Sequence, residues 1–444
     1  MTENDNYLHL MVDLPSDVSR RCVAGDLEGA RRLITRYLDA GCELPLRCRL
    51  NAELDRLRRL ESNYPYDRAT AIALVRQEWP DFTEAQFDAL VDAQRIDWRY
   101  INGEERYLAS FLTSLRLYPK DAPGLKQTAE DHTKRDNILR RMEEEGEISA
   151  LITLKAAIRP NQSARGKAVQ AWLPIPAQCP QQSGIQILSA TEGYTLAPED
   201  TQARTIYWES RERDSFEVTY RYKFRAEYVD PFTLPWDGQQ PLFYTGEWLP
   251  HIAFTPYLRT LAERLTKDLD TPVEKAYAIY NWVTENVDYR HQPSYVLLDN
   301  IADTCAKDLR GDCGVMALLF ITLCRIAGIP SKWQSGLSVH PDSAGCHDWC
   351  MFYAAPHGWL YADPSFGSGA RRNLEPLRRR HYFGSLDPWR MVANSAFQTP
   401  LSPADPCFRH DPYDNQLGEM TVDGVGLLGS EMERTVETLE FTLL

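Results

Sequence analysis

At residues 310–319 the chain reads RGDCGVMALL, and an apolar run at helical spacing follows. This pattern predicts a helix over residues 311–328, with Cys313 in its first turn. The unpaired amide N–H groups and the positive end of a helix dipole favour a thiolate, so we expect the pKa of Cys313 to be lowered. Gly311 and Gly314 leave room for another chain to approach the sulfur. The stretch therefore predicts a cysteine nucleophile whose own amide can help hold an oxyanion.

A histidine and an aspartate lie downstream in two short β-like runs. His347 opens the run at 347–354, and Asp363 directly follows the run at 358–362. If the two runs pair as a hairpin, both side chains come to one end of the sheet. Asp363 can then accept the proton on one imidazole nitrogen, which leaves the other nitrogen to accept from Cys313. The sequence therefore predicts a Cys-His-Asp triad.

Helices and strands are also predicted on the amino-terminal side of this stretch. A capping box, Thr271 with Glu274, begins a helix after an earlier helical run at 256–269. Strict apolar and polar alternation at 216–224 is typical of a half-buried strand. Similar β-rich runs predict a small antiparallel sandwich, and they lie at 150–158, 169–175, 185–188 and 205–208.

The first 120 residues show helical spacing, a capping box at Thr83 and Gln86, and a hairpin turn at Asn102 and Gly103. Helices followed by a hairpin resemble a winged-helix module. The net charge up to residue 120 is only -3, so we expect a packing or docking role there and no DNA binding.

Five ordered motifs resemble the core of the transglutaminase-like superfamily. They are Gly-Asp-Cys-Gly at 311–314, Arg-Ile-Ala-Gly-Ile-Pro at 325–330, His-Asp-Trp at 347–349, Gly-Trp at 358–359 and Asp-Pro at 363–364. The resemblance covers roughly residues 249–367. It implies a papain-like α+β fold, with Cys313 as nucleophile, His347 as base and Asp363 as the residue that orients the base. It also implies that the chemistry needs no cofactor.

The resemblance further implies a side chain upstream that completes the oxyanion hole. The candidates are Trp282, Tyr289, Gln292 and Tyr295, and the sequence does not choose among them. The extra domains and acidic metal sites of the large calcium-dependent crosslinkers have no equivalent in the sequence. Water is always available as acceptor, so hydrolysis is the preferred outcome.

Composition limits the remaining possibilities. The 444 residues carry a net charge of -14, which argues against nucleic acid as a partner. No run approaches the length of a membrane-spanning helix, and the acidic start lacks a secretory signal, so we expect a cytoplasmic protein. A zinc site from Cys305, Cys313, Cys346 and Cys350 is disfavoured because a Cys-x3-Cys pair on a strand lacks the turn that brings two thiolates together. No metal and no other cofactor are expected.

The sequence therefore predicts an α+β multidomain enzyme that transfers acyl groups through a thioester, acting on a carboxamide, peptide or isopeptide bond. The alternative is an inactive transglutaminase-like core that serves as a binding scaffold. The natural substrate and the oligomeric state are left open. The predicted order is a helical region at 1–120, a charged linker or helix at 121–148, a β-sandwich at 149–230, a papain-like catalytic domain at 231–395, and a β-rich tail packing on the core at 396–444.

Overall fold

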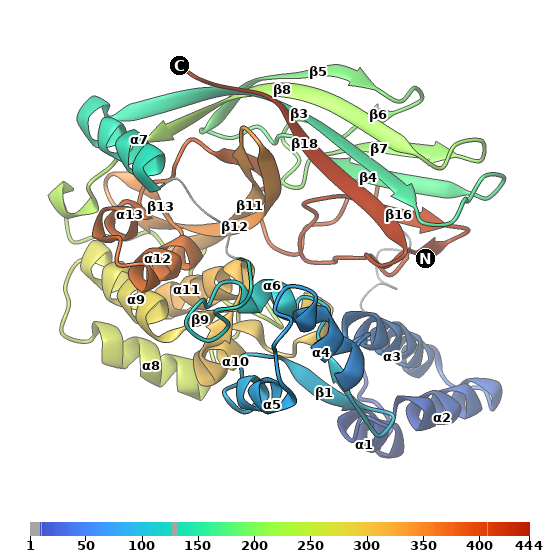
Figure 1. Cartoon of the computed structure of the whole chain (residues 1–444). Helices are drawn as coiled ribbons and strands as arrows, with labels where there is room; N and C mark the ends of the chain where they lie inside the picture. Colours follow the sequence, from blue (N-terminus) through green and yellow to red (C-terminus); the bar gives the residue numbers. More distant parts are fainter. Residues whose placement is uncertain (1–8, 10, 127–131, 406) are drawn as a thin grey trace. The chain divides into compact units, whose positions relative to one another are not determined.

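The computed structural model describes residues 9, 11–126, 132–405 and 407–444 (Figure 1). The chain divides into two compact units. Unit 1 comprises Met1–Glu130 and His291–Leu297, and unit 2 comprises Asp131–Arg290 and Leu298–Leu444. Residues 127–131 of the predicted linker and most of the first ten residues of the helical region lie outside the described residues.

Unit 1 is built from short helices and one hairpin, as the sequence predicts. The Thr83 side chain accepts from the Gln86 amide while the Gln86 side chain accepts from the Thr83 amide, which confirms that capping box. The hairpin turns at Asn102 and Gly103, both with positive φ. The elements are α1 (Ser16–Val23), α2 (Leu27–Asp39), α3 (Leu44–Asn63), α4 (Arg68–Arg76), α5 (Glu84–Asp92), β1 (Trp98–Ile101), β2 (Glu104–Tyr107), α6 (Phe111–Leu115) and the 3-10 turn η3 (Tyr295–Leu297).

The charged stretch that begins unit 2 forms a helix, α7 (His132–Glu145). Its Leu139 and Met142 are buried in an apolar core that they share with strands of the sandwich, and the partly buried Ile138 packs against the same core. These three apolar side chains hold an otherwise charged helix on the sheet.

The predicted sandwich is present and is larger than the sequence indicates, because the carboxyl-terminal tail adds strands to both sheets. Besides two short strands, the tail contains the 12-residue strand β18 (Met432–Leu443), which pairs along β3 (Glu147–Pro160) (Figure 1). The first sheet has the order β18-β3-β8-β5, with β5 (Gln182–Ala190) and β8 (Phe216–Glu227). The second has the order β17-β16-β4-β7-β6, with β4 (Val169–Pro174), β6 (Thr195–Leu196), β7 (Thr205–Ser210), β16 (Glu419–Val422) and β17 (Val425–Gly426).

A third sheet, here called the core sheet, has the order β14-β13-β12-β11-β15. The predicted hairpin is confirmed, since β12 pairs antiparallel with β13. The strands are β11 (Ser331–His340), β12 (Ser343–Ala354), β13 (Gly358–Ala362), β14 (Phe383–Gly384) and β15 (Arg390–Asn394). The remaining elements of unit 2 are η2 (Pro231–Thr233), α8 (Pro256–Thr266), α9 (Pro272–Asn286), β9 (Asp288–Tyr289), α10 (Ile301–Asp308), β10 (Arg310–Gly311), α11 (Cys313–Ile326), α12 (Pro364–Arg372) and α13 (Pro376–His381).

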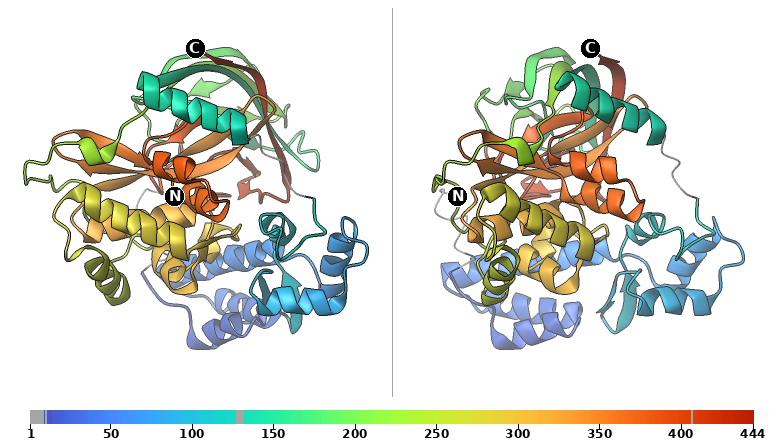
Figure 2. Two further views of the ribbon diagram at one scale, coloured as in Figure 1. Left: turned by 60° about the vertical axis from the view of Figure 1, so that its left-hand side comes forward. Right: turned by 90° about the vertical axis from the view of Figure 1, so that its left-hand side faces the viewer.

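The core sheet lies between the sandwich and α11 (Figure 2). Successive side chains of a strand point to opposite faces, and β12 uses both faces. Trp349 joins the apolar core of the sandwich, whereas Phe352 contacts Phe320 of α11 with ring centroids 6.1 Å apart. Every residue from Cys313 to Arg325 is buried, so α11 is fixed on all sides. None of the described helices combines the length and the apolar character needed to cross a bilayer.

We expect Gly336→Ala to destabilise unit 2. Gly336 lies opposite His347 in the β11–β12 register, and a Cβ there would stand 1.9 Å from the Met391 carbonyl oxygen of β15. Separating these strands should lower the free energy of unfolding by about 1–3 kcal/mol. Gly345→Ala on β12 is the matched control, because its Cβ meets nothing within 4 Å. Urea titration followed by tryptophan fluorescence measures both, and equal midpoints would contradict the expectation.

Candidate active site

Cys313 occupies the first position of α11, as the sequence predicts. The preceding Asp312 caps the helix, because its carboxylate accepts a 3.1 Å hydrogen bond from the Val315 amide. Gly311 pairs with Tyr289 in the short parallel bridge between β10 and β9. A Cβ at position 311 would lie 2.5 Å from the Val315 side chain, so glycine is required for this close approach. The cap and the bridge together fix the start of the helix, and Cys313 is 8% exposed.

The sulfur of Cys313 lies against Asp348 of β12. The thiol donates to Oδ2 of Asp348 over 3.3 Å, and the sulfur also accepts from the backbone amide of Asp348. The Tyr289 side chain bonds the sulfur as well. Among the described residues the thiol makes no hydrogen bond to His347, although His347 immediately precedes Asp348 on the strand. The sulfur of the predicted nucleophile therefore lies against the residue next to the predicted base, and the two are not hydrogen-bonded to each other.

His347 and Asp363 are directly bonded, as the predicted triad requires. Nε2 of His347 lies 2.7 Å from Oδ2 of Asp363, and the imidazole stacks on the Phe366 ring with centroids 4.1 Å apart. Asp363 also caps α12, since its Oδ1 accepts from the Phe366 amide and from the Ser365 hydroxyl, each at 2.9 Å. Nδ1 of His347 makes no hydrogen bond within the part of the chain that the structure describes. The ring is thus held from one side with its second nitrogen available.

A buried arginine stands behind this pair. Arg390 of β15 is fully buried and places Nη2 2.9 Å from Oδ2 of Asp363 and 2.6 Å from Oδ2 of Asp387. The Tyr382 hydroxyl donates to the same oxygen of Asp387 over 2.7 Å. Burial opposes the ionisation of Asp363, but His347 and Arg390 outweigh it and hold the pKa of this carboxyl well below its usual range. Asp363 is therefore a carboxylate at every working pH.

The pKa of the Cys313 thiol is raised, which makes the sequence-based expectation wrong in direction. Burial is the main cause, and the carboxyl groups of Asp348 and Asp312 raise this pKa further when they are ionised. The positive end of a helix shifts a pKa only modestly, whereas burial disfavours any charged form strongly. The pKa of His347 is lowered, first by burial and then by the charge of Arg390, although Asp363 opposes the shift. Thiol and imidazole are both neutral in this geometry.

One of the four oxyanion candidates lies at the sulfur. Tyr289 of β9 bonds Cys313, and burial followed by the Cys313 charge raises the pKa of its hydroxyl. Trp282 is half-buried on α9 and makes no hydrogen bond to Cys313 among the described residues. Gln292 and Tyr295 belong to the 291–297 segment of unit 1. The oxyanion role remains a prediction, and within unit 2 Tyr289 is the candidate that the geometry favours.

Sequence analysis missed three polar residues at the site: Asp348, Asp414 and Gln416. Nε2 of Gln416 donates to the His347 carbonyl oxygen over 3.0 Å and to Oδ1 of Asp348 over 2.5 Å. Asp414 shares a side-chain hydrogen bond with Asp348. Residues 414 and 416 lie in the tail, far from His347 in sequence, so no local pattern could have placed them at the site.

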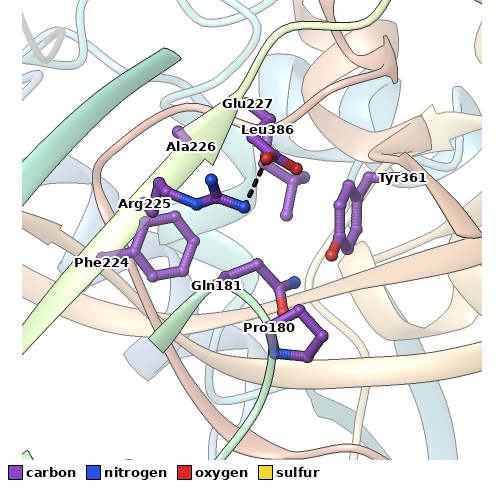
Figure 3. A pocket seen from close by; sticks show the side chains of 8 residues that line it. All are labelled: Pro180, Gln181, Phe224, Arg225, Ala226, Glu227, Tyr361 and Leu386. Atoms are coloured by element: carbon purple, nitrogen blue, oxygen red, sulfur yellow. Dashed lines mark ion pairs between the residues drawn. The ribbon is translucent and has the colours of Figure 1, made fainter. Parts of the chain in front are cut away.

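Two other features of unit 2 lie apart from the triad. In the described part of the chain, no group of three or more His, Cys, Asp or Glu side chains is arranged to hold a metal ion. A small pocket between β8 and β13, shown in Figure 3, is lined by none of the triad residues. Its lining is Pro180, Gln181, Phe224, Arg225, Ala226, Glu227, Tyr361 and Leu386.

Comparison with known proteins agrees with this geometry. Residues 259–364 match the model of the Transglutaminase-like superfamily, a range that contains Cys313, His347 and Asp363. This segment is a transglutaminase-like core. The transglutaminase-like core thus carries all three residues of the predicted triad, while the sandwich and residues 1–130 of unit 1 lie outside the match.

Solved structures resemble parts of the chain at low identity. A proposed cysteine protease from Cytophaga hutchinsonii is 14% identical, covers 66% of this chain and 91% of its own, and has a TM-score of 0.39. The periplasmic domain of TgpA from Pseudomonas aeruginosa is 15% identical, covers 55% and 96%, and has a TM-score of 0.27. No protein with a curated description matches the chain. The assignment of the transglutaminase-like core therefore depends on the family match and on the observed helices and strands.

We expect Arg390→Met to destabilise the transglutaminase-like core by about 3–5 kcal/mol, because it leaves Asp363 and Asp387 as buried carboxylates without a cation. Arg159→Met is the control, since Arg159 pairs with Glu433 on the exposed surface of the sandwich and should cost at most about 1 kcal/mol. Urea unfolding at pH 7 measures both variants. Equal losses in the two variants would show that the buried cation is dispensable.

Proposed function

We propose that the protein is a cysteine acyl-transfer enzyme that hydrolyses a carboxamide, peptide or isopeptide bond through a thioester on Cys313. The observation that supports this most directly is the bonded His347–Asp363 pair on the hairpin, beside the strand position against which the Cys313 sulfur lies. The transglutaminase-like core supports the same class of chemistry. A neutral imidazole held by a permanent carboxylate is suited to act as a general base.

The proposed reaction begins with a rotation of the Cys313 side chain from Asp348 toward Nδ1 of His347. Nδ1 takes the thiol proton as the sulfur attacks the carbonyl carbon of the substrate. The imidazolium then gives this proton to the leaving amine, and the acyl group stays on the sulfur as a thioester. In the second half His347 takes a proton from water, and the resulting hydroxide attacks the thioester carbonyl. The C–S bond breaks, the imidazolium returns its proton to the sulfur, and the carboxylic acid leaves. Asp363 stabilises the imidazolium in both halves without accepting the proton itself.

The oxyanion that forms on the carbonyl oxygen needs donors close to the sulfur. The Cys313 amide lies in the first turn of α11, where it has no helical partner. The Tyr289 hydroxyl is the proposed second donor, because it bonds the sulfur and its raised pKa keeps it protonated. Two such donors in a buried site stabilise developing charge more strongly than the same donors in water.

Water is proposed as the acceptor only because it is always available to the site. A peptide or protein is the proposed substrate class, and the cytoplasm is the proposed compartment. The competing possibility is a binding protein with an inactive core. An inactive core would leave Cys313 without any acylated form, so trapping of the thioester separates the two possibilities.

We expect Cys313→Ala to lower kcat by about 10⁴-fold or more and to abolish the thioester, because no other group replaces the nucleophile. The assay screens fluorogenic peptide and isopeptide libraries and detects acylated Cys313 by mass spectrometry after acid quenching. Cys324→Ala serves as the control, since Cys324 is buried in the same helix and should leave the rate unchanged. Turnover that survives in Cys313→Ala would rule out the proposed mechanism.

We expect Tyr289→Phe to lower kcat by about 10²–10³-fold through loss of one oxyanion donor. The rate at which iodoacetamide alkylates Cys313 should fall far less than kcat, because alkylation develops no oxyanion and loses only the hydrogen bond from Tyr289 to the sulfur. Tyr277→Phe is the control, as the Tyr277 ring packs on Phe232 and Phe383 of the same unit. An unchanged kcat in Tyr289→Phe would remove this hydroxyl from the mechanism.

A further inference from the structure

We infer that Asp348 is a positioning residue that acts as a neutral carboxylic acid, kept protonated by its buried partner Asp414, and so keeps negative charge away from the sulfur of Cys313. This inference deepens the proposed function, on which it rests. It assigns a role to a carboxyl pair outside the triad and makes the reactivity of the thiol depend on that pair.

The geometry brings the pair and the sulfur into one buried cluster. Asp348 and Asp414 are 5% and 7% exposed. Oδ2 of Asp348 accepts the thiol hydrogen bond over 3.3 Å, and the two carboxyl groups bond each other. Gln416 donates to the remaining oxygen, Oδ1 of Asp348, over 2.5 Å. Two carboxyl groups in contact at low dielectric cannot both ionise without a strong penalty, so the pair retains one proton.

The hydrogen bonds indicate which carboxyl keeps the proton. Oδ1 of Asp414 accepts from the Ser335 hydroxyl over 2.6 Å and from the Asn394 amide. Donors of this kind favour the ionised form, so Asp414 is the carboxylate of the pair. Asp348 also accepts from the Cys313 thiol and from Gln416, but burial, Asp414 and Asp312 outweigh these donors and raise its pKa well above the usual range.

The other charged or titratable groups around the pair do not neutralise it. Arg409 lies near Asp414, but its guanidinium bonds Glu419, with Nη2 2.7 Å from Oε1. Arg434 of β18 lies near Cys346 and Asp411, and burial lowers the pKa of its guanidinium. The remaining groups are acids, hydroxyls or thiols that add negative charge when they ionise. They are Asp312 and Cys313 of α11, Tyr289 of β9, Cys346 of β12 and Asp411 in the tail, and burial together with Asp414 raises the pKa of Asp411 to about 7.

The sign of the effect on Cys313 follows. While Asp348 is protonated, the group nearest the sulfur is neutral, and removing the thiol proton creates no like-charge contact with it. When Asp348 ionises, a carboxylate stands 3.3 Å from the sulfur and opposes the thiolate. At a pH below the thiol pKa, a rise of one unit in that pKa lowers the thiolate fraction about tenfold. The alkylation rate falls by the same factor, because the thiolate is the reacting form.

Two isosteric substitutions in the full-length chain test the inference, because they predict opposite effects. Asp414→Asn removes the carboxylate that keeps the proton on Asp348 and offers an amide to Asp348, so Asp348 ionises and Cys313 alkylates about tenfold more slowly at pH 7. Asp348→Asn removes the ionisable group itself. Its Cys313 should alkylate at least as fast as wild type from pH 5 to 9, and faster wherever the wild-type Asp348 carboxyl is ionised.

The measurement is the rate of Cys313 modification by iodoacetamide from pH 5 to 9, followed by peptide mass mapping. Slower alkylation in both variants would indicate structural damage and overturn the inference, as would equal rates in Asp414→Asn and wild type. The proposed function is judged separately by peptide turnover. If peptides are turned over but Asp414→Asn leaves the alkylation rate unchanged, only the inference is refuted. If the two variants change the alkylation rate in opposite directions but no peptide is turned over, only the proposed function is refuted.

A second measurement needs no stable Asp414 variant. The infrared carbonyl band of a protonated carboxylic acid should appear in the difference between wild type and Asp348→Asn at pH 7. Its presence supports a neutral Asp348 in the folded protein. Its absence, with the carboxylate bands of Asp348 in its place, overturns the inference.

Discussion

The packing of α11 on β12 is the constraint on which the site depends. A helix buried from Cys313 to Arg325 cannot slide or rotate without exposing or overpacking apolar side chains. Both of its ends are also fixed by polar contacts. Asp312 caps the start, and at the other end Nε of Arg325 donates to the Ser331 carbonyl oxygen over 2.8 Å. The sulfur is therefore held at one position along β12, next to residues 347 and 348.

The buried charges behind His347 explain why this strand can carry a base. Asp363, Arg390 and Asp387 together have a net charge of -1 when the imidazole is neutral, and the cluster becomes neutral when His347 gains a proton. Burial penalises an isolated imidazolium, but here the added charge completes an existing set of opposite charges. The stabilising groups are already oriented before the reaction, so little reorganisation accompanies proton transfer to His347.

The sequence was informative wherever the controlling signal is local. The Thr271–Glu274 capping box, the start of α11 and the strand at 358–362 all appear as predicted, because caps and periodicity act over a few residues. The pairing of β18 with β3 was not predicted, since register between strands nearly three hundred residues apart leaves no local pattern. The predicted direction of the Cys313 pKa shift was wrong for the same reason. The helix start is visible in the sequence, whereas the carboxyl groups that surround the sulfur gather only in the folded chain.

The two opposite pKa shifts also constrain how the thiol is used. A preformed thiolate–imidazolium pair requires a thiol pKa below that of the imidazole, whereas here burial raises the first and lowers the second. In the proposed reaction, proton transfer therefore accompanies attack on the carbonyl, as it does for a serine nucleophile. In such a mechanism the charges develop only in the transition state and have to be stabilised there. The Asp363 carboxylate stabilises the imidazolium as it forms. A neutral Asp348 is consistent with this requirement, because a carboxylate at 3.3 Å would destabilise the sulfur at the moment its proton leaves.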